Sequence, residues 1–184
     1  MSLTTPPKSG NSEFKAVTAR GLQPAICSLI VDMGTLEQEY QGTKKQLYKV
    51  YFEFTLQNGE RVGKIFTYSF HEKSALTQCL IAWCNSKDFV KDLSKYVGSM
   101  VVLNLVDSVV KEKTYVNIQS FIFFDEKGIF KDSIKDFENV KCISFDYADS
   151  LTWSTFENGL IPQYILDKMM ETKEFENWKN DKLK

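Results

Sequence analysis

The chain has 184 residues, of which 43% are apolar and 14% aromatic, so it can form one domain with a sizeable core, or one domain with an appendage. Its net charge of −1 excludes a histone-like polycation that binds its partner by charge alone. The charge is uneven, because residues 1–124 carry 14 basic against 11 acidic side chains and residues 125–184 carry 9 against 13.

The N-terminal part begins with a polar stretch and continues into an apolar strand. Residues 1–20 are rich in Pro, Ser and Thr, which predicts a disordered arm without the apolar core of a secretory signal. Residues 25–32 are short and apolar, and they predict a first β-strand that Met33 and Gly34 end. The polar segment 35–45 is predicted to be a loop.

The next two strands form the segment on which the functional hypothesis depends. Residues 46–56 and 61–70 are rich in β-branched and aromatic side chains, and the pair Asn58-Gly59 between them predicts a hairpin with a type I′ turn. Side chains alternate across a strand. The alternation therefore predicts a hairpin surface on which lysines alternate with aromatic rings.

The pattern then changes from strand to helix and back. Helical spacing of apolar residues predicts a helix over 72–84 and a short helical turn over 87–96. Two more strands are predicted over 99–106 and 114–124, joined by a charged loop over 109–113. The fold class is therefore mainly β. The order of three strands, a helix and two strands predicts a five-stranded OB-fold barrel over residues 21–124. A β-sandwich and an open α+β sheet are the alternatives.

The region 125–184 is predicted to be an acidic C-terminal extension, part irregular and part α-helical. Ile161-Pro162 precedes a predicted amphipathic helix over 163–178. Its apolar stripe comprises Ile165, Met169, Phe175 and Trp178. We expect this stripe to pack on the parent domain; a docking site for a partner is the alternative.

The sequence favours binding over catalysis. A single histidine, His71, leaves little material for a nucleophile and base pair, and no glycine-rich phosphate loop is present. The four cysteines, Cys27, Cys79, Cys84 and Cys142, lack metal-ligand spacing and are predicted to be reduced, as suits a cytoplasmic protein. No apolar run approaches the ~20 residues of a membrane span. We therefore expect no enzyme activity, no cofactor and no metal.

Single-stranded nucleic acid is bound by cations that follow the phosphates and by aromatic planes on which bases stack. Residues of both kinds gather in the hairpin, in the segment after it and in the two predicted loops that flank the ligand face of an OB barrel. The predicted DNA-binding residues are Lys44, Lys45, Lys49, Tyr51, Arg61, Lys64, Phe66, Tyr68, Lys73, Lys111, Lys113 and Tyr115.

Several stretches in order along the chain resemble a family of single-stranded DNA-binding proteins of tailed bacteriophages. They are 21–34, 49–54, 69–76 with Trp83, Asp92-Leu93 with Gly98, and 115–120, with a weaker continuation at 160–162 and in the helix after it. The resemblance implies an OB-type domain that coats single strands in phage DNA replication or recombination. It carries the binding role over to Lys49, Tyr51 and Lys73; the other candidates come from the residue pattern alone.

The leading hypothesis is therefore sequence-tolerant binding of single-stranded DNA. The acidic region 125–184 is a candidate contact for replication or recombination proteins, although the chain ends without the short acidic tip closing on Phe that bacterial single-strand binders often have. The alternative is a non-catalytic interaction or assembly module, such as a replisome scaffold or minor virion component. A homo-oligomer is compatible with either hypothesis.

Overall fold

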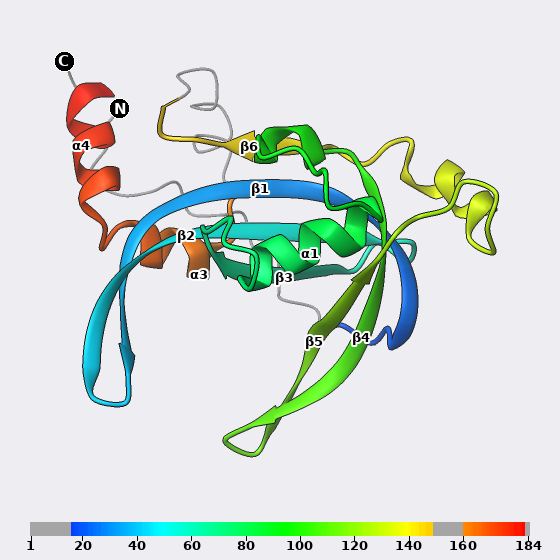
Figure 1. Ribbon diagram of the computed structural model, residues 1–184, viewed down its shortest axis with the longest axis horizontal. Coiled ribbons are helices and arrows are strands. Elements are labelled where there is room, and N and C mark those ends of the chain that lie inside the picture. The colour runs from blue at the N-terminus through cyan, green and yellow to red at the C-terminus, as the bar shows by residue number, and fades with distance from the viewer. Residues whose placement is uncertain (1–15, 149–159, 183–184) are drawn as a thin grey trace.

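The computed structural model describes residues 16–148 and 160–182 (Figure 1). Five strands pair antiparallel in the order β3-β2-β1-β4-β5, and a short strand, β6, pairs parallel with β1. The elements are β1 (Gly21–Tyr40), β2 (Thr43–Leu56), β3 (Arg61–Thr67), α1 (Ala75–Cys84), η1 (Leu93–Tyr96), β4 (Met100–Val110), β5 (Lys113–Ile122), η2 (Lys131–Phe137), β6 (Ile143–Phe145), α3 (Gln163–Met169) and α4 (Lys173–Lys182). The predicted mainly β class and the helix between the third and fourth strands are confirmed. The sheet curls like a barrel, but no strand pairing joins β3 to β5.

The two predicted loops are wrong, because both are built mostly of strand. In place of the loop over 35–45, β1 runs on to a two-residue turn at Gln41 and Gly42, both at positive φ, and β2 returns beside it. In place of the loop over 109–113, β4 and β5 meet at a similar turn at Lys111 and Glu112. We call residues 35–48 the β1–β2 arm and residues 107–116 the β4–β5 arm; both curve away from the body in Figure 1.

The turn between β2 and β3 also differs from the prediction. Among its residues only Gly59 has a positive φ, of 81°, so the turn is not of type I′. The Gly59 amide donates to the Leu56 carbonyl at 2.9 Å, and the Leu56 amide donates to the Glu60 carbonyl at 2.8 Å. This is the three-residue hairpin loop in which a glycine follows an ordinary turn.

The first hydrophobic core fills the inside of the curled sheet beneath α1 and η1. Phe52, Phe54, Trp83 and Phe121 pack there as a cluster of ring contacts between 5.5 and 6.4 Å. The predicted helix over 72–84 begins only at Ala75, because the Ser74 side chain accepts from the Thr77 amide and caps it. Of the predicted turn over 87–96, only the 3-10 helix η1 forms.

A second core lies on the other face of β1 and β2, where the C-terminal region covers the sheet. Apolar side chains of β1 pack there against β6, α3 and α4. The predicted stripe of Ile165, Met169, Phe175 and Trp178 is buried in this core, so its packing on the parent domain is confirmed. The prediction of a single helix is wrong, because the helix is interrupted at Thr172 between α3 and α4. The Thr172 hydroxyl donates to the Met169 carbonyl at 2.7 Å and accepts from the Phe175 amide.

Much of the predicted N-terminal arm, residues 1–15, lies outside the described part of the chain. Residues 16–20 are held against the body, where Val17 and Ala19 pack on the first core. All four cysteines are free, and Cys27 and Cys79 are buried. None of the helices among the described residues is both long and apolar enough to cross a membrane.

Candidate functional site

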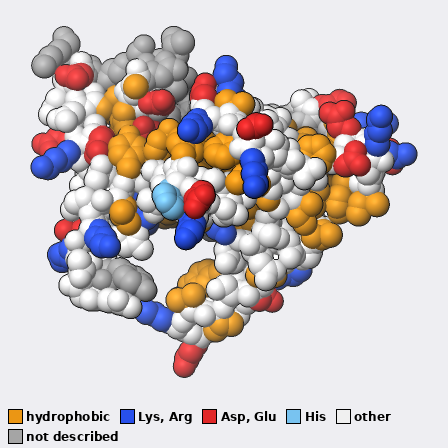
Figure 2. Space-filling view, viewed as in Figure 1, with side chains coloured by type: hydrophobic (Ala, Val, Ile, Leu, Met, Phe, Trp, Pro, Cys, Tyr) orange, Lys and Arg blue, Asp and Glu red, His pale blue; other side chains and the backbone are white. Residues whose placement is uncertain are grey.

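A cavity of about 530 Å³ lies along the free edge of β3, and we call it the basic groove. Its lining includes three lysines and one histidine, and none of the described residues that line it is acidic. The full lining is Gln38, Lys49, Lys64, Ile65, Phe66, Thr67, Ser69, His71, Lys73, Ser74 and Ala75. In Figure 2 this region opens onto a hollow that the curved arms bound. The groove is thus a local positive site on a chain of net charge −1.

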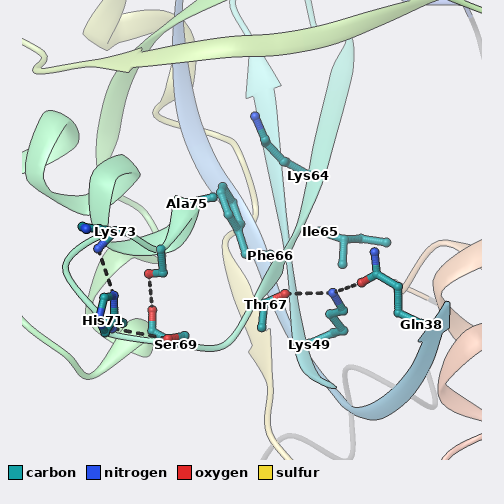
Figure 3. A pocket seen from close by; sticks show the side chains of 11 residues that line it. Gln38, Lys49, Lys64, Ile65, Phe66, Thr67, Ser69, His71, Lys73 and Ala75 are labelled. Carbon is teal, nitrogen blue, oxygen red and sulfur yellow. Dashed lines mark hydrogen bonds between the residues drawn. The ribbon is translucent and has the colours of Figure 1, made fainter. Parts of the chain in front are cut away.

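Lys49 reaches the groove from β2. Its amino group donates to the Gln38 side-chain oxygen at 2.7 Å and to the Thr67 hydroxyl at 2.8 Å (Figure 3). Partial burial lowers the pKa of this amine, and neither oxygen carries a charge to offset the desolvation. An anionic ligand would supply the missing counter-charge.

Lys64 lies on β3, on the face of the sheet opposite to Lys49. Because β3 is an edge strand, side chains from both faces can reach the groove along its edge. The Lys64 amino group donates to the Ile118 carbonyl of β5 at 2.7 Å, across the gap that no strand pairing closes. It also lies 5.8 Å from the centre of the Phe66 ring and 5.9 Å from that of Phe121. Burial lowers the pKa of this lysine too. Lys64 is therefore both a structural bridge and a candidate anion contact.

The segment between β3 and α1 supplies the third side of the groove. Lys73 is exposed there, and its backbone amide donates to the Nδ1 atom of His71 at 3.2 Å. The Ser74 hydroxyl donates to the Ser69 carbonyl at 2.6 Å and holds the segment against the helix start. Reasoning from strands alone missed Ser69 as a groove residue and did not assign His71 to binding; their place directly after an edge strand is the signal that could have indicated both.

Tyr51 does not face solvent, so its predicted role as a stacking platform is wrong. Its side chain is only 2% exposed and belongs to the second core. Its hydroxyl donates to Glu53 at 3.1 Å and accepts from the Tyr164 hydroxyl of α3 at 2.8 Å. The expected open surface of β2 is covered by the C-terminal helices, whose packing the hairpin sequence could not reveal.

Phe66 is also buried, at 3% exposure, and the prediction that it stacks with bases is wrong as well. It points into the first core, where it contacts Phe52 at 5.5 Å and Phe121 at 6.0 Å. Side-chain alternation along β3 turns Phe66 toward the inside of the curled sheet. There it packs against other aromatic rings and is shielded from solvent. Phe66 is nevertheless one of the residues that line the groove.

Tyr68 is exposed, but it lies outside the basic groove. It meets the ring of Tyr48, which the prediction had not included, at 5.8 Å. Both rings line a second cavity of about 220 Å³ that also contains Asp32, Asp92 and Asp146. Burial raises the pKa of Asp32 to about 6, and the Tyr48 hydroxyl donates to it at 2.9 Å. The structure therefore places Tyr68 among carboxylates, apart from the lysines.

The remaining predicted cations of the arms are all exposed. Lys44 pairs with Glu37 at 2.7 Å, and Lys45 lies beside it in β2. Lys111 and Lys113 lie at the tip of the β4–β5 arm, and Tyr115 is exposed two residues further along β5. These residues thus lie on the arms that bound the hollow, separate from the groove lining.

Arg61 makes a structural contact on the face of the sheet where Tyr51 and Glu53 are buried. Its guanidinium lies 3.6 Å from Glu53, whose carboxylate is buried. Burial raises the pKa of Glu53, while Arg61 and the Tyr51 hydroxyl oppose that rise. Arg61 therefore partners a buried carboxylate and is less suited to a phosphate than the lysines of the groove.

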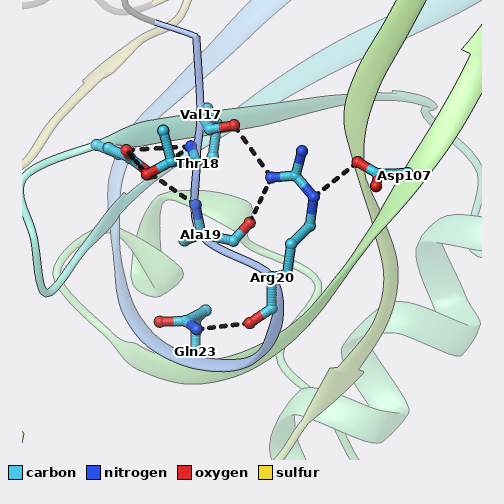
Figure 4. A network of polar contacts seen from close by, with 7 residues as sticks. Val17, Thr18, Ala19, Arg20, Gln23 and Asp107 are labelled. Carbon is cyan, nitrogen blue, oxygen red and sulfur yellow. Dashed lines mark hydrogen bonds and ion pairs between the residues drawn. The ribbon is translucent and has the colours of Figure 1, made fainter.

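Residues before β1 tie one arm to the body. The Thr18 and Ala19 amides donate to the Glu60 carboxylate at 3.0 to 3.1 Å, and these bonds, with that from the Thr18 hydroxyl, lower the Glu60 pKa to about 2. The Arg20 guanidinium donates to Asp107 at 2.6 Å and to two carbonyls of its own segment (Figure 4). This network fixes the base of the β4–β5 arm relative to the β2–β3 turn.

The geometry suits an extended polyanion. Lysines with no carboxylate partner among the described residues line a groove, and the groove opens between two arms that carry further lysines. Comparison with known proteins adds no family: no family model matches the chain, and no curated protein matches it significantly.

Proposed function

We propose that this protein binds single-stranded DNA without strong sequence preference, with the strand's phosphates in the basic groove and the strand passing between the two arms. The observation that carries the proposal is the groove itself, where Lys49, Lys64 and Lys73 line one cavity without a carboxylate. Two of these amines are partly desolvated, so a phosphate would restore the counter-charge that they lack.

The strand arrangement supports an OB-fold as the finer description of the fold. In that fold the ligand lies across the second and third strands, between the loops that join strands one to two and four to five. Here the two arms occupy those positions, and the groove lies beside β3. A role in phage DNA replication or recombination is part of the same proposal and rests on the resemblance alone.

A charge-reversal pair tests the proposal. Lys73 and Lys111 are exposed and make no side-chain hydrogen bond or ion pair within the described residues, so Lys73→Glu with Lys111→Glu should leave the fold intact. Fluorescence anisotropy with labelled oligo-dT of about 30 nucleotides should show at least a tenfold loss of affinity at low salt. The salt slope should also fall by about 1.4, since each single-strand phosphate contact contributes roughly 0.7.

The matched control is Lys131→Glu with Lys135→Glu on η2, which changes the net charge equally on exposed lysines outside the groove. This control should bind oligo-dT within about twofold of the unchanged protein. Equal losses in both variants would show that only overall charge matters. Failure of the unchanged protein to bind at low salt would remove the proposal.

The alternative, a non-catalytic interaction module, is favoured by apolar side chains exposed near the end of β5 and around η2. Phe123, Ile129 and Ile134 are all exposed there. Phe123→Ser with Ile129→Ser would abolish capture of a partner protein under this alternative. The same change leaves oligo-dT binding unaltered if the groove is the site.

A further inference from the structure

The β4–β5 arm exposes three large apolar or aromatic side chains to solvent. Val109 is 69% exposed, and Val110 and Tyr115 are each 53% exposed. Beyond the contact between Arg20 and Asp107 at its base, no ion pair or side-chain hydrogen bond holds the arm within the described residues. Exposed apolar side chains next to lysines indicate a contact surface.

The apolar residues lie on both faces of the arm. Val109 is in register with Thr114, and Val110 with Lys113. Leu105 and Ile118 are buried in the first core, so alternation along β4 puts Val109 on the face that continues from the barrel interior. Val110, Lys113 and Tyr115 take the opposite face. An arm that packed on a single surface would need only one apolar face.

The tip of the arm is narrow. Lys111 and Glu112 form its two-residue turn with φ of 49° and 65°, a region that residues with a Cβ rarely adopt. A two-residue hairpin turn of this kind needs positive φ at both positions, and it is the shortest common connection between two strands. A narrow end with apolar residues on both faces and a lysine on each side of Glu112 is suited to insertion between two surfaces.

We propose that the β4–β5 arm is a wedge that recognises the junction between single-stranded and duplex DNA, an inference that rests on the function proposed above. At such a junction two strands diverge, the last base pair presents an apolar face, and phosphates lie on both sides. The face with Val109 packs against the last base pair on the side of the strand held between the arms, a contact that oligo-dT lacks. The face with Val110, Lys113 and Tyr115 meets the other strand, where Tyr115 stacks on an unpaired base.

A forked duplex with 2-aminopurine in its first base pair tests the wedge against an oligo-dT of the same tail length. The unchanged protein should raise the 2-aminopurine fluorescence and bind the fork roughly tenfold more tightly than oligo-dT. Val109→Ser with Val110→Ser should abolish both effects and leave oligo-dT affinity within about twofold. Val90→Ser, at a valine 54% exposed elsewhere, is the matched control and should preserve both.

The outcomes separate the two proposals. If oligo-dT is bound but the valine pair variant keeps the fluorescence rise and the fork preference, the wedge is wrong and the groove stands. If the unchanged protein binds neither DNA, both fail. If sedimentation shows that the valine pair variant alone loses self-association, or if the arm binds anionic vesicles and ignores the fork, its apolar faces serve another contact and the wedge is overturned.

Discussion

Two regions of the β2–β3 hairpin differ in whether another part of the chain covers them. On the outer face of β1 and β2, the ring of Tyr51 is buried under α3 and the Glu53 side chain, which accepts from the Tyr51 hydroxyl, is buried beside it; we call this the covered face. A few residues away, Lys49 and Thr67 lie on the same side of the sheet and line the open basic groove. Alternation decides which side a residue takes, but what packs on that side decides whether it can bind a ligand.

On the covered face, one glycine leaves room for the aromatic ring that packs there. A Cβ on Gly63 would lie on top of the Tyr51 ring, so the glycine leaves the space that the ring fills. The ring then meets Tyr164 edge to face at 5.9 Å. The groove has no such cover, and its half-buried amines are bonded only to neutral oxygens. We expect changes on the covered face to alter stability and changes in the groove to alter DNA affinity.

The largest expected effect is that of Gly63→Ala on the covered face. The new Cβ must displace Tyr51 and the helix above it, which should cost roughly 3 kcal/mol of unfolding free energy, toward the upper end for overpacking. Urea denaturation measures the loss. Combining the change with Tyr51→Leu should recover part of it, because the collision disappears.

Gly21→Ala is the control for this change. Gly21 has a φ of 71° and open space around it, so alanine there should cost about 1 kcal/mol through backbone strain alone. Equal losses at the two glycines would contradict the close fit between Gly63 and Tyr51.

An intermediate effect is expected from Lys64→Met in the groove. Methionine keeps the apolar stem near Phe66 and Phe121 and removes the amine, so stability should change by less than about 1 kcal/mol. Affinity for oligo-dT should fall about fivefold, with a salt slope smaller by about 0.7. A large loss of stability would instead show that the hydrogen bond from Lys64 to the Ile118 carbonyl serves mainly to hold β3 against β5.

The smallest effect concerns the pH dependence of the covered face. Burial raises the pKa of Glu53 above its ordinary 4.5, so the folded state favours the protonated carboxyl. The stability that this group contributes is complete below pH 4.5 and is lost as the pH rises through the folded pKa. Relative to the unchanged protein, Glu53→Gln should therefore become more stable as the pH rises. Denaturation at several pH values between about 4 and 8 measures the difference, and a constant difference would contradict the raised pKa.

The sequence predicted the order of strands and helix correctly because hydrophobic periodicity reports on local structure. It placed Lys49, Lys64 and Lys73 correctly near one another, since strand pairing and the start of α1 bring them together. It failed for Tyr51 because the residues that bury it come more than 100 positions later, in α3. It failed for Phe66 because the barrel face of an edge strand cannot be distinguished from the solvent face by alternation alone.

The most direct test of the central claim follows both regions in one experiment. In a titration of ¹⁵N-labelled protein with oligo-dT, the amide signals of Lys49, Thr67, Ser69, His71 and Lys73 should shift, and those of Ile165, Met169 and Trp178 should stay in place. The opposite pattern, in which the amide signals of the covered face shift and those of the groove do not, would contradict the account.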